Sequence, residues 1–291
     1  MGVINAMKVL SFGEILWDVY DDAKYIGGAP FNFAAHLAKH KEEVHMLTSI
    51  GEDELGKEAL SRLEGYNIHT DYICVSNQKQ TGCCLVTLDE NSVPAYNLLD
   101  DVAYDYIKCD DIPNSHDVLY FGTLALRSEY NFNSLKELIN NHSFKEIFVD
   151  VNIRPPFYSY STTAFALNNA TILKISLEEL PVVSNIIGIN YSGDYKAFSC
   201  RLSKAYKNLS VIIVTLASDG AFVLNCRNGK EYYKSAVKSE VKSTVGAGDS
   251  FSAAFLHKYM SGEGIQSSLD YAIKLSAFVV SQYDAVPNYD V

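Results

Sequence analysis

The sequence has 291 residues, of which 48% are apolar and 20% are charged. This balance favours a folded chain with a sizeable core and excludes intrinsic disorder. The formal net charge of −11 excludes a general affinity for nucleic acid or anionic membranes, so any phosphate site has to be built locally.

The segment from Met1 to Lys8 has no signal-peptide core, and no apolar run reaches the roughly 18 residues of a membrane span. We therefore expect a cytoplasmic protein. The cysteines form no CxxC pair, which favours reduced and mostly buried thiols over disulfides or a zinc knuckle. They are Cys74, Cys83, Cys84, Cys109, Cys200 and Cys226.

Apolar runs with strand character alternate with segments of helical periodicity along the chain. The predicted strands are Val9–Phe12, Val44–Ser49, Val118–Phe121, Ile147–Val149, Ile172–Ile175 and Val211–Leu216. The predicted helices are Phe31–His40, Leu55–Glu64, Asn133–Asn141, Leu177–Asn185 and Tyr195–Lys207. This alternation indicates an α/β fold in three layers, with a mostly parallel sheet and helices on both faces.

One stretch, Asp71–Leu99, departs from this rhythm. Its apolar runs predict a strand at 72–75 and a β-hairpin whose turn lies at Asp89–Ser92. Together with residues 15–26, residues 71–99 are predicted to form a small antiparallel lid over a pocket. We expect residues 1–291 to form a single domain, and the edges of the lid are compatible with a homodimer.

The most informative segment is Ser243–Phe251, in which a glycine-rich turn opens a helix. The backbone N–H groups of Gly246, Ala247 and Gly248 can converge on a phosphoryl group, and the helix dipole adds positive potential. Asp249 in the first helical turn can then accept a proton from an attacking hydroxyl. Alternatively, Asp249 only complements the dipole and the glycines only shape the turn.

The chain contains neither a GxxxxGK[ST] loop nor a protein-kinase HRD/DFG pair. The turn instead resembles the second signature of ribokinase-like, or PfkB-type, carbohydrate kinases. Residues 27–35, which begin Gly27-Gly28 and include Asn32, resemble the first signature, GG-x-x-x-N-x-A. The resemblance extends from about Lys8 to Pro287 and implies an ATP-dependent sugar kinase with Asp249 as general base.

The same resemblance implies a sugar site. It assigns the acceptor to Asp18, Gly27, Gly28 and Asn32, with Arg154 in the active-site crevice. Paired glycines allow close approach to the backbone, and an asparagine amide both donates to and accepts from hydroxyl groups. The alternatives are a surface turn for Asp18, a simple turn with a solvated Asn32, and a structural salt bridge for Arg154.

The nucleotide side is implied by two further segments. Lys174 and Glu179 match the family segment K-x-N-x-x-E. The resemblance implies that Glu179 lies near the Mg²⁺ ion and contacts it through a water molecule. Thr215 and Gly220 match the T-x-G-x-x-G nucleotide turn. The alternatives are a capping box from Ser176 to Glu179 and a turn without nucleotide contact at 215–220.

Several positions depart from the family pattern. Ser243 replaces an aspartate linked to monovalent cations, so potassium activation is doubtful. Asp284 replaces a glycine at the edge of the adenine pocket, and Ala217 replaces a glycine of the nucleotide turn. Ser176 replaces asparagine, as fructokinase-like members often have it. Trp17-Asp18, Gly27-Gly28-Ala29-Pro30 and Lys174-x-Ser176 together are most similar to fructokinases, so fructose is the expected acceptor. Ribose, 2-keto-3-deoxygluconate, a nucleoside or a sugar-binding regulator without catalysis stay open.

Overall fold

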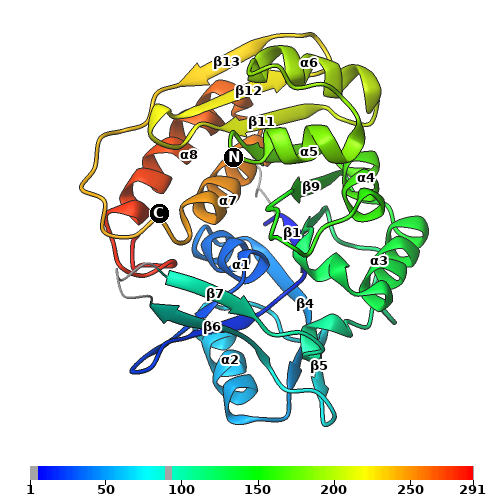
Figure 1. Cartoon of the computed structure of the whole chain (residues 1–291), viewed down its shortest axis with the longest axis vertical. Coiled ribbons are helices and arrows are strands. Elements are labelled where there is room, and N and C mark those ends of the chain that lie inside the picture. Colours follow the sequence, from blue (N-terminus) through cyan, green and yellow to red (C-terminus); the bar gives the residue numbers. More distant parts are fainter. Residues whose placement is uncertain (1–5, 89–93, 291) are drawn as a thin grey trace.

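The computed structural model describes residues 6–88 and 94–290, and its centre is a nine-stranded sheet (Figure 1). The strand order is β13-β12-β11-β10-β9-β8-β1-β4-β5. The pairings from β11 to β5 are parallel, whereas β12 and β13 are added antiparallel at one edge. The expectation of a mostly parallel α/β sheet is confirmed.

The inner strands of this sheet are largely buried, as expected when helices cover both faces, whereas the edge strands β5 and β13 are partly exposed. They are β1 (Lys8–Phe12), β4 (Glu43–Gly51), β5 (Ile73–Ser76), β8 (Val118–Gly122), β9 (Glu146–Asp150), β10 (Ile172–Ser176), β11 (Val211–Thr215), β12 (Ala221–Asn225) and β13 (Glu231–Lys234).

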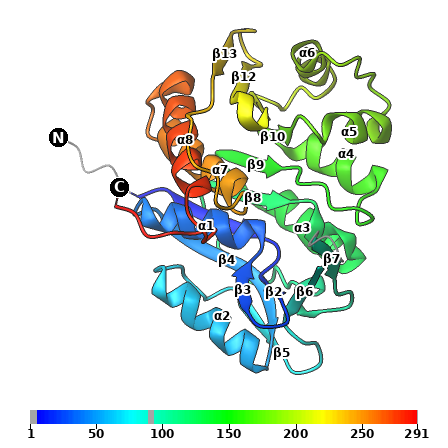
Figure 2. The ribbon, with the colours of Figure 1, turned by 60° about the vertical axis from the view of Figure 1, so that its left-hand side comes forward.

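Helices cover both faces of the sheet, so the molecule has the three predicted layers (Figure 2). One face packs against α1 (Ala29–Lys39), α2 (Glu54–Gly65), α7 (Ala247–Met260) and α8 (Gly264–Val280). The other face packs against α3 (Glu129–Asn141), α4 (Tyr160–Asn169), α5 (Leu180–Ile187) and α6 (Tyr195–Ala205). Alternate residues of each strand point to opposite layers: Val9 belongs to the first core and Leu10 to the second.

A second, four-stranded sheet has the order β3-β2-β6-β7. Its strands are β2 (Leu16–Val19), β3 (Lys24–Gly27), β6 (Gly82–Leu88) and β7 (Pro94–Leu98). The β2–β3 and β6–β7 ladders are antiparallel, while the central β2–β6 ladder is parallel. It has a small core of its own that includes Leu16, Val86 and Tyr104. We call this unit the small sheet.

The predicted lid is wrong in one element. The strand expected at 72–75 is β5, which pairs in parallel with β4 in the main sheet and takes no part in the small sheet. The predicted turn at Asp89–Ser92 falls in a segment that lies outside the described residues. The single domain and the role of residues 15–26 and 71–99 as a lid over a pocket stay predictions.

Four elements were not expected from the sequence: β12, β13, α4 and α8. Three short 3-10 helices, Ala103–Asp105, Leu124–Arg127 and Ala217–Asp219, complete the elements of the described ranges. Within residues 6–88 and 94–290, none of the helices combines the length and apolar character needed to cross a membrane.

Candidate active site

The carboxyl ends of the parallel strands carry the predicted site residues, as is usual in open α/β sheets. At this edge, Lys174 of β10 lies opposite Asp150 of β9 in the strand register. The Lys174 ammonium donates to Asp150 Oδ2 at 2.6 Å, and both side chains are buried. Burial alone would lower the pKa of Lys174, but the charge and hydrogen bond of Asp150 outweigh burial and raise it. Lys174 is therefore a fixed positive charge.

The predicted glycine turn lies beside this charge. Gly246 is the N-cap of α7 and has φ +78°, and a Cβ added there would lie 2.4 Å from the carbonyl oxygen of Ala285. A Cβ added at Gly248 would lie 3.2 Å from Lys174 Nζ. The first turn of α7 thus places N–H groups next to an ammonium, which is the arrangement that binds an anion.

Asp249 follows in the same helical turn. Its Oδ2 accepts a hydrogen bond from Asn32 Nδ2 at 2.9 Å, so the two signatures meet. Burial raises the pKa of Asp249 to about 6; the Asn32 hydrogen bond opposes this rise, and the negative charge of Asp150 adds to it. Asp249 is consequently a carboxylate at neutral pH whose proton affinity suits a general base.

Asn32 reaches Asp249 because of how α1 begins. Gly28 has φ +107°, and a Cβ there would lie 2.5 Å from the carbonyl oxygen of Glu14, so the turn requires glycine. Pro30 in the first turn suits a helix start. Asn32 is 4% exposed, and its Oδ1 has no hydrogen-bond partner among the described residues.

Asp18 of β2 lies next to the Gly27–Gly28 turn. A Cβ added at Gly27 would lie 3.4 Å from Asp18 Oδ2. Burial raises the pKa of Asp18, and a hydrogen bond from the Cys84 thiol and the charge of Arg154 partly oppose the rise. The expected sugar-side residues Asp18, Gly27, Gly28 and Asn32 therefore lie around one turn.

Glu14 is a buried carboxyl close to the charges of Arg154 and Asp249 that the sequence does not single out. It is 3% exposed, and its Oε2 lacks a partner within the described ranges. Burial raises the pKa of Glu14 to about 7, against the opposing effect of backbone amides and Arg154. Glu14 lies four residues before Asp18, but its burial depends on the Gly28 turn that packs against it and is not visible in the sequence.

A cavity of about 290 Å³ opens between the ends of β9 and β10. It contains three expected residues, Arg154, Lys174 and Glu179. Asn152, with φ +44°, shapes the loop after β9. The lining is Asp150, Asn152, Ile153, Arg154, Pro155, Lys174, Ser176, Glu178, Glu179 and Val182. Arg154 is exposed, and its charge lowers the pKa values of Glu14, Asp18 and Asp249, so it belongs to the same electrostatic centre.

Glu179 connects two loops at the rim of this cavity. Its Oε1 accepts from the Ile153 N–H at 2.6 Å, and its Oε2 accepts from the Ser176 N–H at 2.7 Å. Helix α5 begins at Leu180, later than the expected Leu177, and Glu179 rather than Ser176 is its N-cap. The Glu179–Ser176 bond nevertheless resembles the expected capping box.

The two residues of the expected nucleotide turn have different surroundings. Thr215 ends β11 beside Ser176, close to the cavity rim. Gly220 is buried with φ +113°, and a Cβ there would lie 2.0 Å from the carbonyl oxygen of Lys234. The backbone of β13 thus explains why Gly220 is glycine.

Two of the positions that depart from the family pattern are among the described residues. Ser243 Oγ accepts a hydrogen bond from the Val245 N–H at 3.2 Å, and Asp284 is exposed.

Comparisons with known proteins agree with this arrangement. Residues 5–290 match the pfkB family carbohydrate kinases, and the chain belongs to that family. It is therefore a sugar kinase by family, as the two signatures predicted.

Among curated relatives, a 5-dehydro-2-deoxygluconokinase of Listeria monocytogenes is 24% identical over 98% of this chain and 90% of its own length. A Bacillus cereus protein named 5-dehydro-2-deoxygluconokinase 2 is 26% identical over 91% of this chain and 83% of its own length. Among solved structures, a fructokinase of Xylella fastidiosa with bound ATP has a TM-score of 0.85 at 19% identity, with 96% and 94% of the two chains covered. A Vibrio cholerae fructokinase with fructose, ADP and calcium has a TM-score of 0.82 at 21% identity, with the same coverage.

Proposed function

We propose that this chain transfers the γ-phosphoryl group of ATP to a hydroxyl group of a sugar, with Asp249 as general base. The observation that carries the proposal is the position of Asp249. It lies in the first turn of α7, it accepts a hydrogen bond from Asn32, and Lys174 lies beside the preceding Gly248. A base and an anion site thus share one helix terminus.

In the proposed step, Asp249 accepts the proton of the acceptor hydroxyl as its oxygen bonds to the γ-phosphorus. The bond between that phosphorus and the bridging oxygen to the β-phosphate breaks, and ADP leaves with the electron pair. The pKa of about 6 leaves Asp249 ionised at pH 7 and still able to hold the proton briefly. The proton is then released to solvent.

Charge that develops on the transferring group is stabilised by fixed donors. The proposed donors are the N–H groups of Gly246, Ala247 and Gly248 and the ammonium of Lys174. Because Lys174 is held by Asp150, its ammonium does not have to reorganise during the step. The Ala247 N–H also donates to the Thr244 carbonyl at 3.3 Å, so it would be shared with the phosphoryl group. In this proposal the small sheet closes over the sugar and excludes water, which would otherwise compete as acceptor.

The residues present fit a hydrated Mg²⁺ better than a directly bound one. Each oxygen of Glu179 already accepts a backbone hydrogen bond, so the remaining lone pairs suit water molecules of the ion's hydration shell. When bound with ATP, Mg²⁺ would neutralise phosphate charge. Thr215 and the loop around Gly220 are proposed to contact the nucleotide. A potassium requirement is not proposed, because Ser243 offers a hydroxyl that already closes a local turn.

For the acceptor, fructose is the first candidate, bound by Asp18, Gly27, Gly28 and Asn32. The similarity of the signatures to fructokinases supports it. A sugar acid such as 5-dehydro-2-deoxygluconate is the second candidate. The relatives that carry this activity support it, and the exposed guanidinium of Arg154 next to the sugar-side residues could pair with its carboxylate.

The test is ADP release from the purified chain with Mg·ATP and a panel of acceptors. The panel contains fructose, ribose, 2-keto-3-deoxygluconate, 5-dehydro-2-deoxygluconate and a nucleoside. We expect one hexose-derived acceptor to give a kcat/KM in the usual range, above about 10⁴ M⁻¹s⁻¹. ADP release from none of them, with sugar binding retained, would instead favour a regulator.

A further inference from the structure

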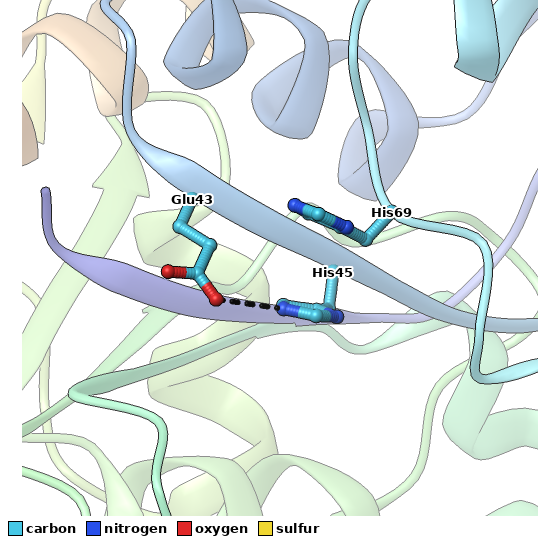
Figure 3. Close-up of side chains that lie close together, drawn as sticks. All are labelled: Glu43, His45 and His69. Atoms are coloured by element: carbon cyan, nitrogen blue, oxygen red, sulfur yellow. Dashed lines mark hydrogen bonds and ion pairs between the residues drawn. The ribbon is translucent and has the colours of Figure 1, made fainter.

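A group of histidine and acidic side chains lies at the start of β4. This is the amino-terminal end of the parallel strands, whereas the proposed catalytic residues lie at their carboxyl ends. Glu43 and His45 are two positions apart on this strand, so their side chains point to the same face. His69 comes from the segment between α2 and β5. Figure 3 shows the three side chains gathered together.

The backbone fixes His69 opposite His45. The two residues form an isolated parallel β-bridge. The His69 N–H donates to the Val44 carbonyl at 2.8 Å, and the Met46 N–H donates to the His69 carbonyl at 3.1 Å. These bonds flank His45 on both sides, so the proximity of the two imidazoles does not depend on side-chain rotamers alone.

The imidazole rings are stacked, with centroids 4.4 Å apart and an interplanar angle of 16°. His45 Nε2 lies 3.4 Å from Glu43 Oε1, the contact drawn in Figure 3. One ligand atom from each of Glu43, His45 and His69 lies within 4.8 Å of the others. His45 is 9% exposed, and its Nδ1 has no hydrogen-bond partner in the described part of the chain.

Asp71 lies on the opposite edge of both rings. Its Oδ2 is 3.8 Å from His45 Nδ1 and 3.9 Å from His69 Nδ1. At these distances Asp71 makes no hydrogen bond to either ring, and His45 Nε2 donates to Glu43 Oε1. If Asp71 moved closer, its carboxylate would hold the proton on Nδ1 and free Nε2 for a metal, which is the orientation that metal-binding histidines commonly have.

We propose that Glu43, His45 and His69 bind a divalent transition-metal ion of the zinc class, with Asp71 as the outer partner of the two imidazoles. Two imidazoles and one carboxylate are the ligands of zinc, cobalt or nickel rather than of magnesium, which prefers oxygen. Water would supply the fourth position.

To bind one ion, the ligand atoms have to move closer and the two stacked rings have to tilt, because lone pairs in nearly parallel ring planes do not converge. Ligands of a tetrahedral zinc ion with bonds of about 2.0–2.1 Å lie about 3.4 Å from one another, and the His45–Glu43 edge already has that length. His69 is half-exposed and can turn toward it. The Lys8 ammonium would compete with the metal ion for Glu43, because it lies 2.8 Å from Glu43 Oε1.

The test is calorimetric titration of the full chain, free of nucleotide and magnesium, with Zn²⁺. We expect the wild type to bind one zinc ion that His45→Gln or His69→Gln weakens by more than tenfold. Asp71→Asn should weaken it by about 10- to 100-fold, the effect typical of an outer partner. Lys8→Gln should strengthen it, because the competing cation is removed.

His142→Gln is the matched control, since the ring nitrogens of this histidine face the carbonyl oxygens of Leu138 and Ile112, away from the cluster. It should leave zinc affinity unchanged. Broadening of the His45 and His69 ring signals by Co²⁺ in NMR spectra gives a second readout. Zinc affinity equal in the wild type and the His45 and His69 variants, or no zinc binding by the wild type, would overturn the proposal. Binding to the free cysteines would give that first result.

Discussion

Asn32 and Asp249 are joined by a hydrogen bond of 2.9 Å, although they lie 217 positions apart in the sequence. The bond connects the first turn of α1 with the first turn of α7, and these helices pack against each other on one face of the sheet. It orients the Asp249 carboxylate, and it is the largest of the effects that oppose the rise of its pKa.

Replacing Asn32 with alanine should move the acid limb of the pH profile of kcat/KM to higher pH. The hydrogen bond stabilises the carboxylate form, so its loss raises the pKa of Asp249 above about 6. A rise of about one pH unit corresponds to a hydrogen bond of about 1.4 kcal/mol. The measurement is the pH dependence of kcat/KM, which reports the free enzyme. An acid limb at the wild-type position would show that the contact does not tune Asp249.

Asp249→Asn should raise the melting temperature at neutral pH. The pKa of Asp249 is raised in the folded chain from 3.8 to about 6. Its contribution to stability is therefore fully present below pH 3.8 and is lost as the pH rises through about 6. An amide has no charge to bury, so the melting temperature of the variant should exceed that of the wild type by a few degrees at pH 7. The conversion is about 2–4 °C per kcal/mol. At pH 4 the difference in melting temperature should be smaller.

Asp53→Asn provides the control for that measurement, with the opposite sign. Hydrogen bonds from Thr81 and Gly56 outweigh burial and lower the pKa of Asp53, the N-cap of α2. Its stability contribution is present above the unfolded pKa and is lost as the pH falls. This variant should melt below the wild type at pH 7. A lower melting temperature for both variants would contradict the burial argument for Asp249.

Gly246→Ala should abolish nucleotide binding and destabilise the chain. The added Cβ would lie 2.4 Å from the Ala285 carbonyl oxygen at φ +78°, so the turn has to move. The strained backbone alone costs about 1–3 kcal/mol. Gly188→Ala is the matched control, because Gly188 has φ +69° and no atom within 4 Å of the added Cβ in the described structure. Denaturant unfolding should show a larger loss for Gly246→Ala; equal losses would exclude the contact with Ala285.

Arg154→Gln should separate the two candidate acceptors. If the acceptor carries a carboxylate, the loss of a charge-assisted pair should raise its KM by roughly 10- to 100-fold, from about 1.5–3 kcal/mol for a hydrogen bond to a charged group. A neutral sugar should show a much smaller change in KM. Steady-state kinetics with both acceptors measures this. Equal changes for the charged and the neutral acceptor would remove Arg154 from carboxylate recognition.

The sequence predicts the layers and the signature residues because their causes are local. Apolar runs such as that of β8 have to be buried on both faces, and a glycine pair before a proline predicts the start of α1. The prediction that β5 belongs to the small sheet was wrong. A four-residue apolar run can pair with either sheet, and the choice depends on the neighbouring strand β4. Such long-range pairing leaves no mark within the run itself.

The candidate site shows the same limit. Asp249 and Asn32 could be predicted to belong to one site, because each belongs to a signature, and the structure joins them by a hydrogen bond. Glu14 and Asp150 were missed because their importance follows from burial next to charges from distant segments. Gly220 was expected to face the nucleotide, yet the backbone of β13 against it is a sufficient reason for glycine.

The turnover of Asp249→Asn with Mg·ATP and the acceptor found in the panel tests the central claim most directly. The variant keeps the shape of the side chain and the α7 turn but has no carboxylate to accept the proton. We predict that kcat falls by roughly 10² to 10⁴-fold, the range of general-base loss. ATP affinity should remain within a few-fold of the wild type. A kcat equal to that of the wild type would contradict the mechanism.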